Sequence, residues 1–413
     1  MAENHLTKGQ DTPQPGERTS RDWAWSFWPL LPIYPYGQRR TLRQEVLNGS
    51  IWTFDQLQGI LYVTVPIRMT VIKLEEGGLL VYAPVAPTKE CLRLMRELEA
   101  EHGPVQYIVL PTTSGLEHKV FVGPFARQFP TAQVYVAPDQ WSFPVRLPLR
   151  WLGLPRKRTV LLPPNSNQTP FGNQFDYAIL GPIRLGIGLF EEVAFFHKRS
   201  QTLLVTDTVL SVPNDPPAIL QLDPYPLLFH ARDDAFDQVE DSPTTRRKGW
   251  QRMALFAFYF RPQALEVVET GQSLKDAQNA PDRSRKALFG WYPFRWKEDW
   301  KRSFEALRGG GRLFVAPILQ TLILNRAPQE VTDWVNHVAS WPFHRIIPCH
   351  LDAPLGGNPR QFRQAFSFLR KDSLSTEEGD GEFLPLPEED FELLRQIDAR
   401  LTQQGITPPV KDY

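Results

Sequence analysis

The chain has too few cysteines for either of the common cysteine-based scaffolds. Its 413 residues include two, Cys91 and Cys349, which stand far apart in the sequence. Two such thiols provide neither a disulfide framework nor a cysteine-based zinc site, and they fit a reducing compartment best. We therefore expect a cytoplasmic protein.

The chain also lacks an excess of charge and any long apolar run. Its 46 basic and 46 acidic side chains balance to a net charge of zero, which argues against a nucleic-acid partner. No stretch approaches the roughly 18 unbroken apolar residues of a transmembrane segment, and the first 20 residues have no apolar signal core. These residues are polar and predict a disordered, flexible tail.

What the chain does have is enough apolar sequence for a large core, 42% of its residues, together with 39 prolines. That is roughly twice the usual proline share of about 5% and predicts short elements with many fixed turns. Aromatic side chains are dense between Trp23 and Tyr36. We expect this stretch to be an extended arm packed on its own domain, with peripheral contact with a membrane as the alternative.

The order of apolar runs predicts an α/β fold. Short β-rich runs (LYVTVPI, MTVIKL and LLVYAPV) precede a helix that Thr88 can cap, and strand and helix patterns alternate from there. Three more strands follow the Pro-rich stretch 138–176, and the last of them ends at Asp207. Such alternation is typical of helices layered on sheets.

Composition shifts divide the chain into five parts. They are a disordered tail (1–20), a first core part (21–240), an aromatic and Pro-rich insertion (241–305), a second core part (306–371) and an acidic tail with a final helix near 391–403 (372–413). Within the insertion, Asp241 to Gly249 predicts a surface link and Trp250 to Phe260 a buried helix.

Four residues are candidates for a functional site because of where they fall relative to predicted elements. His118 follows a buried strand, His230 stands in LLFHARDD, Asp207 ends a strand and His350 closes one. In layered α/β folds, side chains at the carboxyl ends of strands meet on one rim, where ligand sites usually form. Imidazole and carboxylate suit zinc, iron or manganese.

The order of these pieces resembles the metallo-β-lactamase-like fold, an αββα sandwich with a His-x-His-x-Asp-His loop and a later histidine, aspartate and histidine. On that pattern Glu117 stands at the loop aspartate, His118 at its last histidine, Asp207 at the bridging aspartate and His350 at the terminal histidine. The resemblance implies that these four residues form the metal site.

Half of the metal-binding pattern is missing. Thr113 and Gly115 stand where the first two histidines should be, and Gly188 and Leu189 lie where the later one should be. In two-metal members of the fold those histidines serve one metal, so the resemblance implies at most a single zinc, iron or manganese ion. Glu191 and Glu192, near the vacated position, are alternative oxygen donors.

Long phrases are similar to the family called domain of unknown function 4336, a branch of this fold found in cyanobacteria and plastids. They include WTFDQLQGILYVTVPIRMTVIKL, LPTTSGLEHKVFVGPFARQFP and EEVAFFHKRSQTLLVTDTVL. Membership implies the fold and a photosynthetic setting but no substrate. Two functions stay open: a non-catalytic binding or assembly scaffold, which the missing ligands favour, and a mononuclear metal-dependent hydrolase of an ester, thioester or phosphoester.

Overall fold

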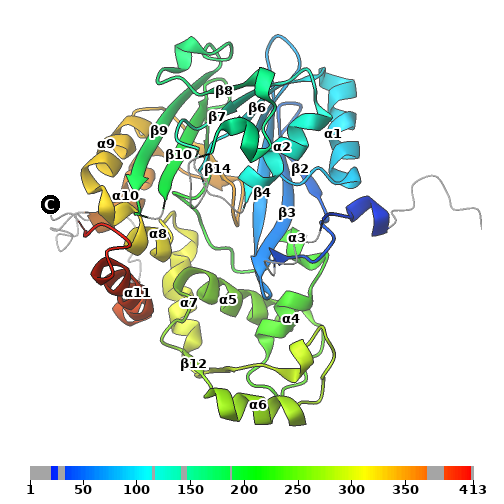
Figure 1. Ribbon diagram of the computed structural model, residues 1–413, viewed down its shortest axis with the longest axis vertical. Helices are drawn as coiled ribbons and strands as arrows, with labels where there is room; N and C mark the ends of the chain where they lie inside the picture. The colour runs from blue at the N-terminus through cyan, green and yellow to red at the C-terminus, as the bar shows by residue number, and fades with distance from the viewer. Residues whose placement is uncertain are drawn as a thin grey trace, which may run out of the picture.

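The computed structural model describes residues 20–26, 33–113, 117–140, 147–186, 188–369 and 386–410, and these form two facing sheets with helices outside (Figure 1). Residues 1–19 of the predicted tail (1–20), part of the aromatic arm (27–32) and residues 372–385 of the predicted acidic tail (372–413) lie outside the described residues. The first sheet has the order β1-β3-β4-β5-β6-β7-β8, with β2 on β3, and the second the order β15-β14-β11-β10-β9.

The strands of the first sheet are β1 (Ile33–Tyr34), β2 (Leu42–Leu47), β3 (Ile51–Ile60), β4 (Val63–Lys73), β5 (Leu79–Tyr82), β6 (Val105–Leu110), β7 (Gln133–Val136) and β8 (Thr159–Leu161). Those of the second are β9 (Phe175–Arg184), β10 (Leu189–His197), β11 (Thr202–Val205), β14 (Arg345–Pro348) and β15 (Leu355–Gly356). A separate two-stranded sheet pairs β12 (Leu265–Val267) with β13 (Phe294–Trp296).

The helices are α1 (Lys89–His102), α2 (His118–Gln128), α3 (Ala218–Gln221), α4 (Tyr225–Ala231), α5 (Pro243–Tyr259), α6 (Thr270–Asn279), α7 (Trp300–Arg308), α8 (Pro317–Leu322), α9 (Pro328–Val338), α10 (Pro359–Ala365) and α11 (Glu392–Gln403). The predicted final helix is present as α11. None of the helices in the described part of the chain is long and apolar enough to cross a membrane.

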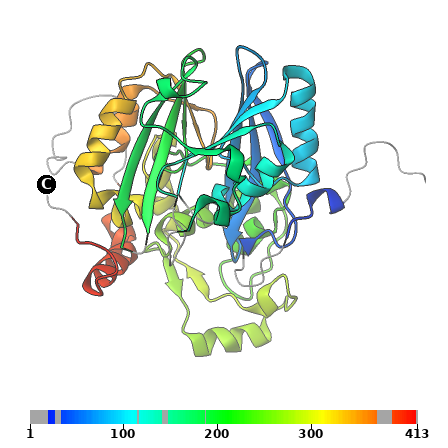
Figure 2. The ribbon, with the colours of Figure 1, turned by 45° about the horizontal axis from the view of Figure 1, so that its top comes forward.

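Three apolar clusters correspond to the three interfaces of an αββα sandwich. In β10, Val193 and Phe195 face the other sheet, whereas Ala194 and Phe196 belong to the cluster that includes α9 and α10. This alternation is the two-residue period of a strand buried on both faces. A third cluster joins α1 and α2 to the first sheet. The predicted sandwich is confirmed, and Figure 2 shows the helices on the outer faces of the two sheets.

Helix α1 illustrates how local sequence sets the layers. The Thr88 hydroxyl accepts a hydrogen bond from the backbone N–H of Cys91 and so caps the first turn. Cys91, Met95 and Leu98 recur on one face and are buried against the first sheet. The helix ends at Gly103, which adopts a φ of 96° that side chains disfavour. The next residues enter β6, parallel to β5.

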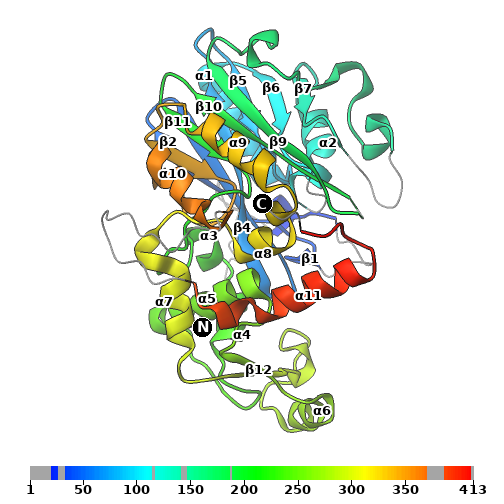
Figure 3. The same cartoon turned by 90° about the vertical axis from the view of Figure 1, so that its left-hand side faces the viewer.

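Two predicted elements differ in the structure. The runs LYVTVPI and MTVIKL form one strand, β4, because Pro66 sits opposite Leu57 without interrupting the pairing with β3. The link predicted at 241–249 is helical from Pro243, because the Ser242 hydroxyl accepts from the Thr245 N–H and proline is tolerated in a first helical turn. Helix α5 packs on β4, and Figure 3 shows α5, α7 and α11 below the sandwich.

Candidate metal centre

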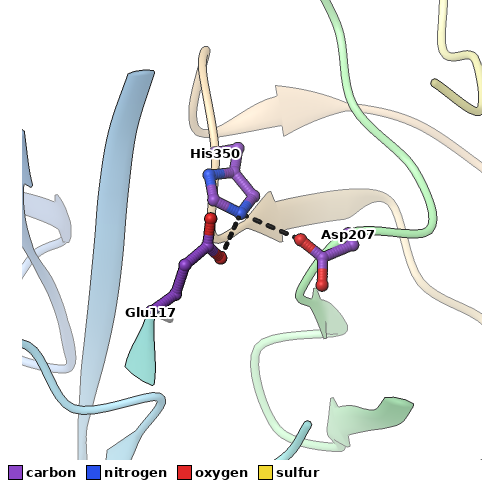
Figure 4. A group of neighbouring side chains, drawn as sticks. All are labelled: Glu117, Asp207 and His350. Atoms are coloured by element: carbon purple, nitrogen blue, oxygen red, sulfur yellow. Dashed lines mark ion pairs between the residues drawn. The ribbon is translucent and has the colours of Figure 1, made fainter. Parts of the chain in front are cut away.

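Three of the four predicted ligands meet between the sheets. The Nε2 atom of His350 lies 3.1 Å from Oε2 of Glu117 and 2.9 Å from Oδ1 of Asp207. One ligand atom from each residue lies within 4.8 Å of the other two, and Figure 4 shows the three side chains converging from different segments. This is one imidazole and two carboxylates around a space that a single cation could occupy.

His350 stands just beyond β14 and is oriented by a backbone carbonyl. Its Nδ1 lies 2.9 Å from the carbonyl oxygen of Pro66 in β4. A carbonyl can only accept, so Nδ1 carries the proton and donates, and Nε2 is turned towards the carboxylates. Burial alone would lower the pKa of His350, but the Glu117 and Asp207 carboxylates outweigh burial and raise it well above the usual range. The two neighbouring carboxylates therefore favour the charged form of the His350 imidazole.

An arginine on β4 holds the loop that carries His350. Arg68 donates to the carbonyl oxygens of Pro348 at 2.9 Å and Leu351 at 2.8 Å. Its guanidinium also binds Asp55 through both carboxylate oxygens, at 2.7 and 2.9 Å, and both side chains are buried. The two carbonyls flank His350 in the sequence, so the arginine fixes the backbone on both sides of the imidazole.

Asp207 lies two residues beyond β11 on a loop wrapped around a buried carboxylate. Glu192 accepts from the backbone N–H groups of Thr206, Asp207 and Thr208 at 2.9 to 3.0 Å and from the Thr208 hydroxyl at 2.7 Å. Burial, with the neighbouring Asp207 charge, raises the pKa of Glu192 to about 7 against the lowering effect of these bonds. Glu192 is thus a positioning residue for Asp207.

Glu117 and His118 stand where α2 begins. Burial works to raise the pKa of Glu117, but the charge and hydrogen bond of His350 lower it below its usual value. The Nδ1 atom of His118 donates to the carbonyl of Pro84 at 3.2 Å, and its buried Nε2 has no hydrogen-bond partner among the described residues. Burial lowers the pKa of His118, so this atom keeps its lone pair. His118 is not in the group of three, although the charges of Glu117, Asp207 and His350 act on its pKa.

The place of the missing histidines is filled by hydrogen bonds between the sheets. The Thr113 hydroxyl donates to the Leu189 carbonyl at 3.0 Å and accepts from the Glu191 N–H at 2.9 Å. An Oε2 atom of Glu191 accepts from the Asp139 N–H at 2.8 Å. Gly115 lies outside the described residues. The two glutamates considered as alternative donors are therefore bound to backbone N–H groups.

The group of three opens into a large apolar cavity of about 1450 Å³. Glu117, Asp207 and His350 all line it, and most of the wall consists of aliphatic and aromatic side chains. His230 also lines the cavity, but its Nε2 donates to the Tyr62 carbonyl at 3.1 Å, and burial lowers its pKa to about 3. His230, which the sequence also placed among the candidates for a site, is therefore a neutral residue of the cavity wall and not part of the group of three.

Sequence reasoning missed Arg68 and assigned Glu192 a different role. The available signal was a charge inside a buried strand: arginine in VPIRMTVIK and glutamate in LFEEVAFFH. Ionised side chains are almost never fully buried unless they are paired, so such a residue predicts a partner. Which partner it has depends on the other sheet.

Comparison with solved structures gives low similarity. The DIM-1 metallo-β-lactamase exposed to ceftazidime is 10% identical, with 80% of this chain and 96% of that chain covered and a TM-score of 0.38. A metallo-β-lactamase from Pontibacter korlensis is 10% identical, with 81% and 100% covered and a TM-score of 0.36. The metal-soaked Flv1 flavodiiron core from Synechocystis sp. PCC6803 is 10% identical with a TM-score of 0.39, and the alignment covers 81% of this chain but 62% of that one.

At these identities and TM-scores the likenesses carry no inference about activity. No curated protein matches the chain. The family profile described as "Domain of unknown function (DUF4336)" matches residues 48–368, more than three quarters of the sequence, and this range contains all four predicted ligands. The chain therefore belongs to the DUF4336 family, as its sequence phrases predicted.

Proposed function

We propose that the protein is a mononuclear metal-dependent hydrolase of an ester, thioester or phosphoester. Glu117, Asp207 and His350 would hold one zinc, iron or manganese ion, and His118 would stand beside them as a further nitrogen donor. The observation that carries the proposal is the meeting of one imidazole Nε2 and two carboxylate oxygens in the wall of a cavity. This differs from the scaffold function that the missing histidines favoured.

The donor set fits a divalent cation. Both His118 and His350 point Nδ1 at a prolyl carbonyl, an arrangement that leaves Nε2 for a metal and is typical of ligating histidines. The buried Nε2 of His118, which has no partner in the described part of the chain, is an atom that a cation could satisfy. When bound, the ion would supply Lewis-acid activation of water and of the scissile group.

The residues themselves perform the remaining tasks. The carboxylates of Glu117 and Asp207 lie 3.1 and 2.9 Å from Nε2 of His350, so a proton and a cation would compete for the same Nε2 lone pair. The apolar wall excludes bulk water, which strengthens the electrostatic interactions inside.

A non-catalytic scaffold is the second candidate. The observation that favours it is the Thr113 hydroxyl, which joins the sheets where a two-metal site would need imidazoles. With the Glu191 and Glu192 carboxylates bound to backbone N–H groups, a bridged pair of metals has no second set of ligands among the described residues. A scaffold would bind a partner or ligand without turnover.

Metal content tests the proposal. We expect the chain, purified and then equilibrated with zinc or manganese, to retain about one equivalent, and His350→Ala and His118→Ala to lose it, because each removes one of very few ligands. His337→Ala, at an exposed position, and His197→Ala, where Nδ1 faces the Ser200 hydroxyl, are the controls and should keep it.

The competing outcomes are distinct. Retention of no metal by the wild-type chain would favour the scaffold, and two tight equivalents would contradict a single site. Hydrolysis of a p-nitrophenyl ester by the loaded wild type but not by His350→Ala would separate enzyme from metal-binding scaffold.

The cellular setting belongs to the same proposal. We propose a reducing cytoplasm, in keeping with Cys91 and Cys349, which are both buried free thiols, and a photosynthetic host, in keeping with the family resemblance. Peripheral membrane contact through Trp23 to Tyr36 stays a prediction, since residues 27–32 lie outside the described part of the chain.

A further inference from the structure

The cavity next to the three candidate ligands is unusually large and apolar for a small-molecule site. Its volume of about 1450 Å³ exceeds the roughly 300–1,000 Å³ of ordinary ligand pockets. Among the 35 described residues that line it, seven are polar, and three of those seven are Glu117, Asp207 and His350. Walls of this kind hold water poorly because a buried water needs two to four polar partners. The space therefore suits a long apolar molecule with one polar group.

The apolar lining continues onto the surface of the protein. Ile60, Trp151 and Trp291 line the cavity and are 50%, 67% and 39% exposed. Leu61 and Phe260 line it as well, at 44% and 38%. Large apolar side chains that line a cavity and are also exposed indicate a surface that an apolar ligand covers. A ligand can thus enter along apolar side chains from outside to the carboxylates.

Some residues that line the cavity have a strained backbone. Leu61, Phe260 and Leu288 line the cavity and have φ values of 49°, 60° and 53°, which leucine and phenylalanine rarely adopt. Such strain persists where the surrounding structure enforces it and is frequent at ligand sites. The strain is therefore consistent with a ligand site at this cavity.

We infer that the cavity binds a long-chain acyl ester or thioester, with the chain along the apolar wall and the scissile carbonyl at Glu117, Asp207 and His350. This inference rests on the proposed hydrolase. In the reaction the acyl carbon gains a bond to the oxygen of water and loses its bond to the alcohol oxygen or thiol sulfur. The two protons of the water go to the leaving group and, by ionisation of the carboxylic acid, to solvent, so no oxidant or reductant is needed.

Binding is tested without turnover by titrating the full chain with cis-parinaric acid, a fluorescent fatty acid of the product class. We expect saturable binding with about one site. Ala257→Trp, on the half-buried α5 wall of the cavity, should weaken it at least about tenfold, whereas Ala399→Trp, at an exposed position of α11 outside the lining, should not. If both variants were folded and bound cis-parinaric acid equally well, or if the wild type did not bind it, the inference would be overturned.

A second pair of variants avoids the risk of misfolding. Ile60→Glu places a charge at the 50% exposed opening, and Leu274→Glu places one at a 55% exposed position outside the lining. Only the first should weaken cis-parinaric acid binding. If Leu274→Glu weakened it as much as Ile60→Glu, the probe would be sensing general surface apolarity, and the assignment to this cavity would be wrong.

Turnover of p-nitrophenyl acetate, butyrate and octanoate by the metal-loaded chain tests the substrate class. Full burial of one methylene raises kcat/KM about fourfold, and octanoate has six more methylenes than acetate. Even partial burial of these groups should therefore raise kcat/KM about tenfold or more from acetate to octanoate. A flat series would overturn the inference and leave the hydrolase standing. Fatty-acid binding in a chain that neither retains metal nor hydrolyses any ester would instead refute the hydrolase and with it the substrate assignment.

Discussion

Removal of the Glu192 carboxylate should destabilise the protein and loosen its metal site together. In Glu192→Ala three backbone N–H groups lose their acceptor, and those of Thr206 and Thr208 belong to buried residues that water does not reach. At about 1–3 kcal/mol for each orphaned buried group, these two predict a loss of about 2–6 kcal/mol. The raised pKa of Glu192 indicates that burying this charge itself opposes folding. We therefore expect the loss of unfolding free energy to lie in the lower part of this range, at about 2–4 kcal/mol.

Urea denaturation at pH 8, where Glu192 is ionised, measures this free energy of unfolding, and zinc affinity is measured on the same samples. Zinc should bind about tenfold or more weakly, because the Asp207 loop is no longer held. Glu97→Ala is the control: that side chain is 44% exposed and pairs with Arg93, so it should cost less than about 1 kcal/mol. If the loss of unfolding free energy in Glu192→Ala differed from that in Glu97→Ala by less than about 0.5 kcal/mol, Glu192 would not hold the Asp207 loop and the prediction would be refuted.

Two further predictions concern stability. Arg68→Met should cost about 3–5 kcal/mol in urea denaturation because it leaves Asp55 buried without its partner, and adding Asp55→Leu should restore part of that loss; a single variant as stable as wild type would contradict this. His230 is neutral in the fold, with a pKa of about 3, while the unfolded chain takes up its proton near pH 6.5. Its contribution is complete above pH 6.5 and is lost as the pH falls, so between pH 7.5 and 5.5 wild type should lose about 1.4 kcal/mol more than His230→Gln; parallel pH profiles would refute the assignment.

The sequence alone determined the layers and the alternation of strands and helices along much of the chain. Apolar runs such as VQYIVL and TLLV are short, bounded by turns and almost entirely apolar, so buried strands were predictable. The sequence also placed Glu117, Asp207 and His350 after strands, where side chains of different segments meet. It divided β4 into two runs, LYVTVPI and MTVIKL, since the continuous pairing with β3 that joins them is not a local property.

Only the tertiary structure decided how the site is held and what it faces. The carbonyls of Pro66 and Pro84 orient two histidines that lie far from them in the chain, and Arg68 reaches the His350 loop 280 residues away. Such hydrogen bonds leave no periodic signal, because each depends on where two sheets face each other. The cavity is of the same kind: its wall draws on residues from 33 to 351, and no single segment shows that their apolar side chains enclose one space beside two carboxylates.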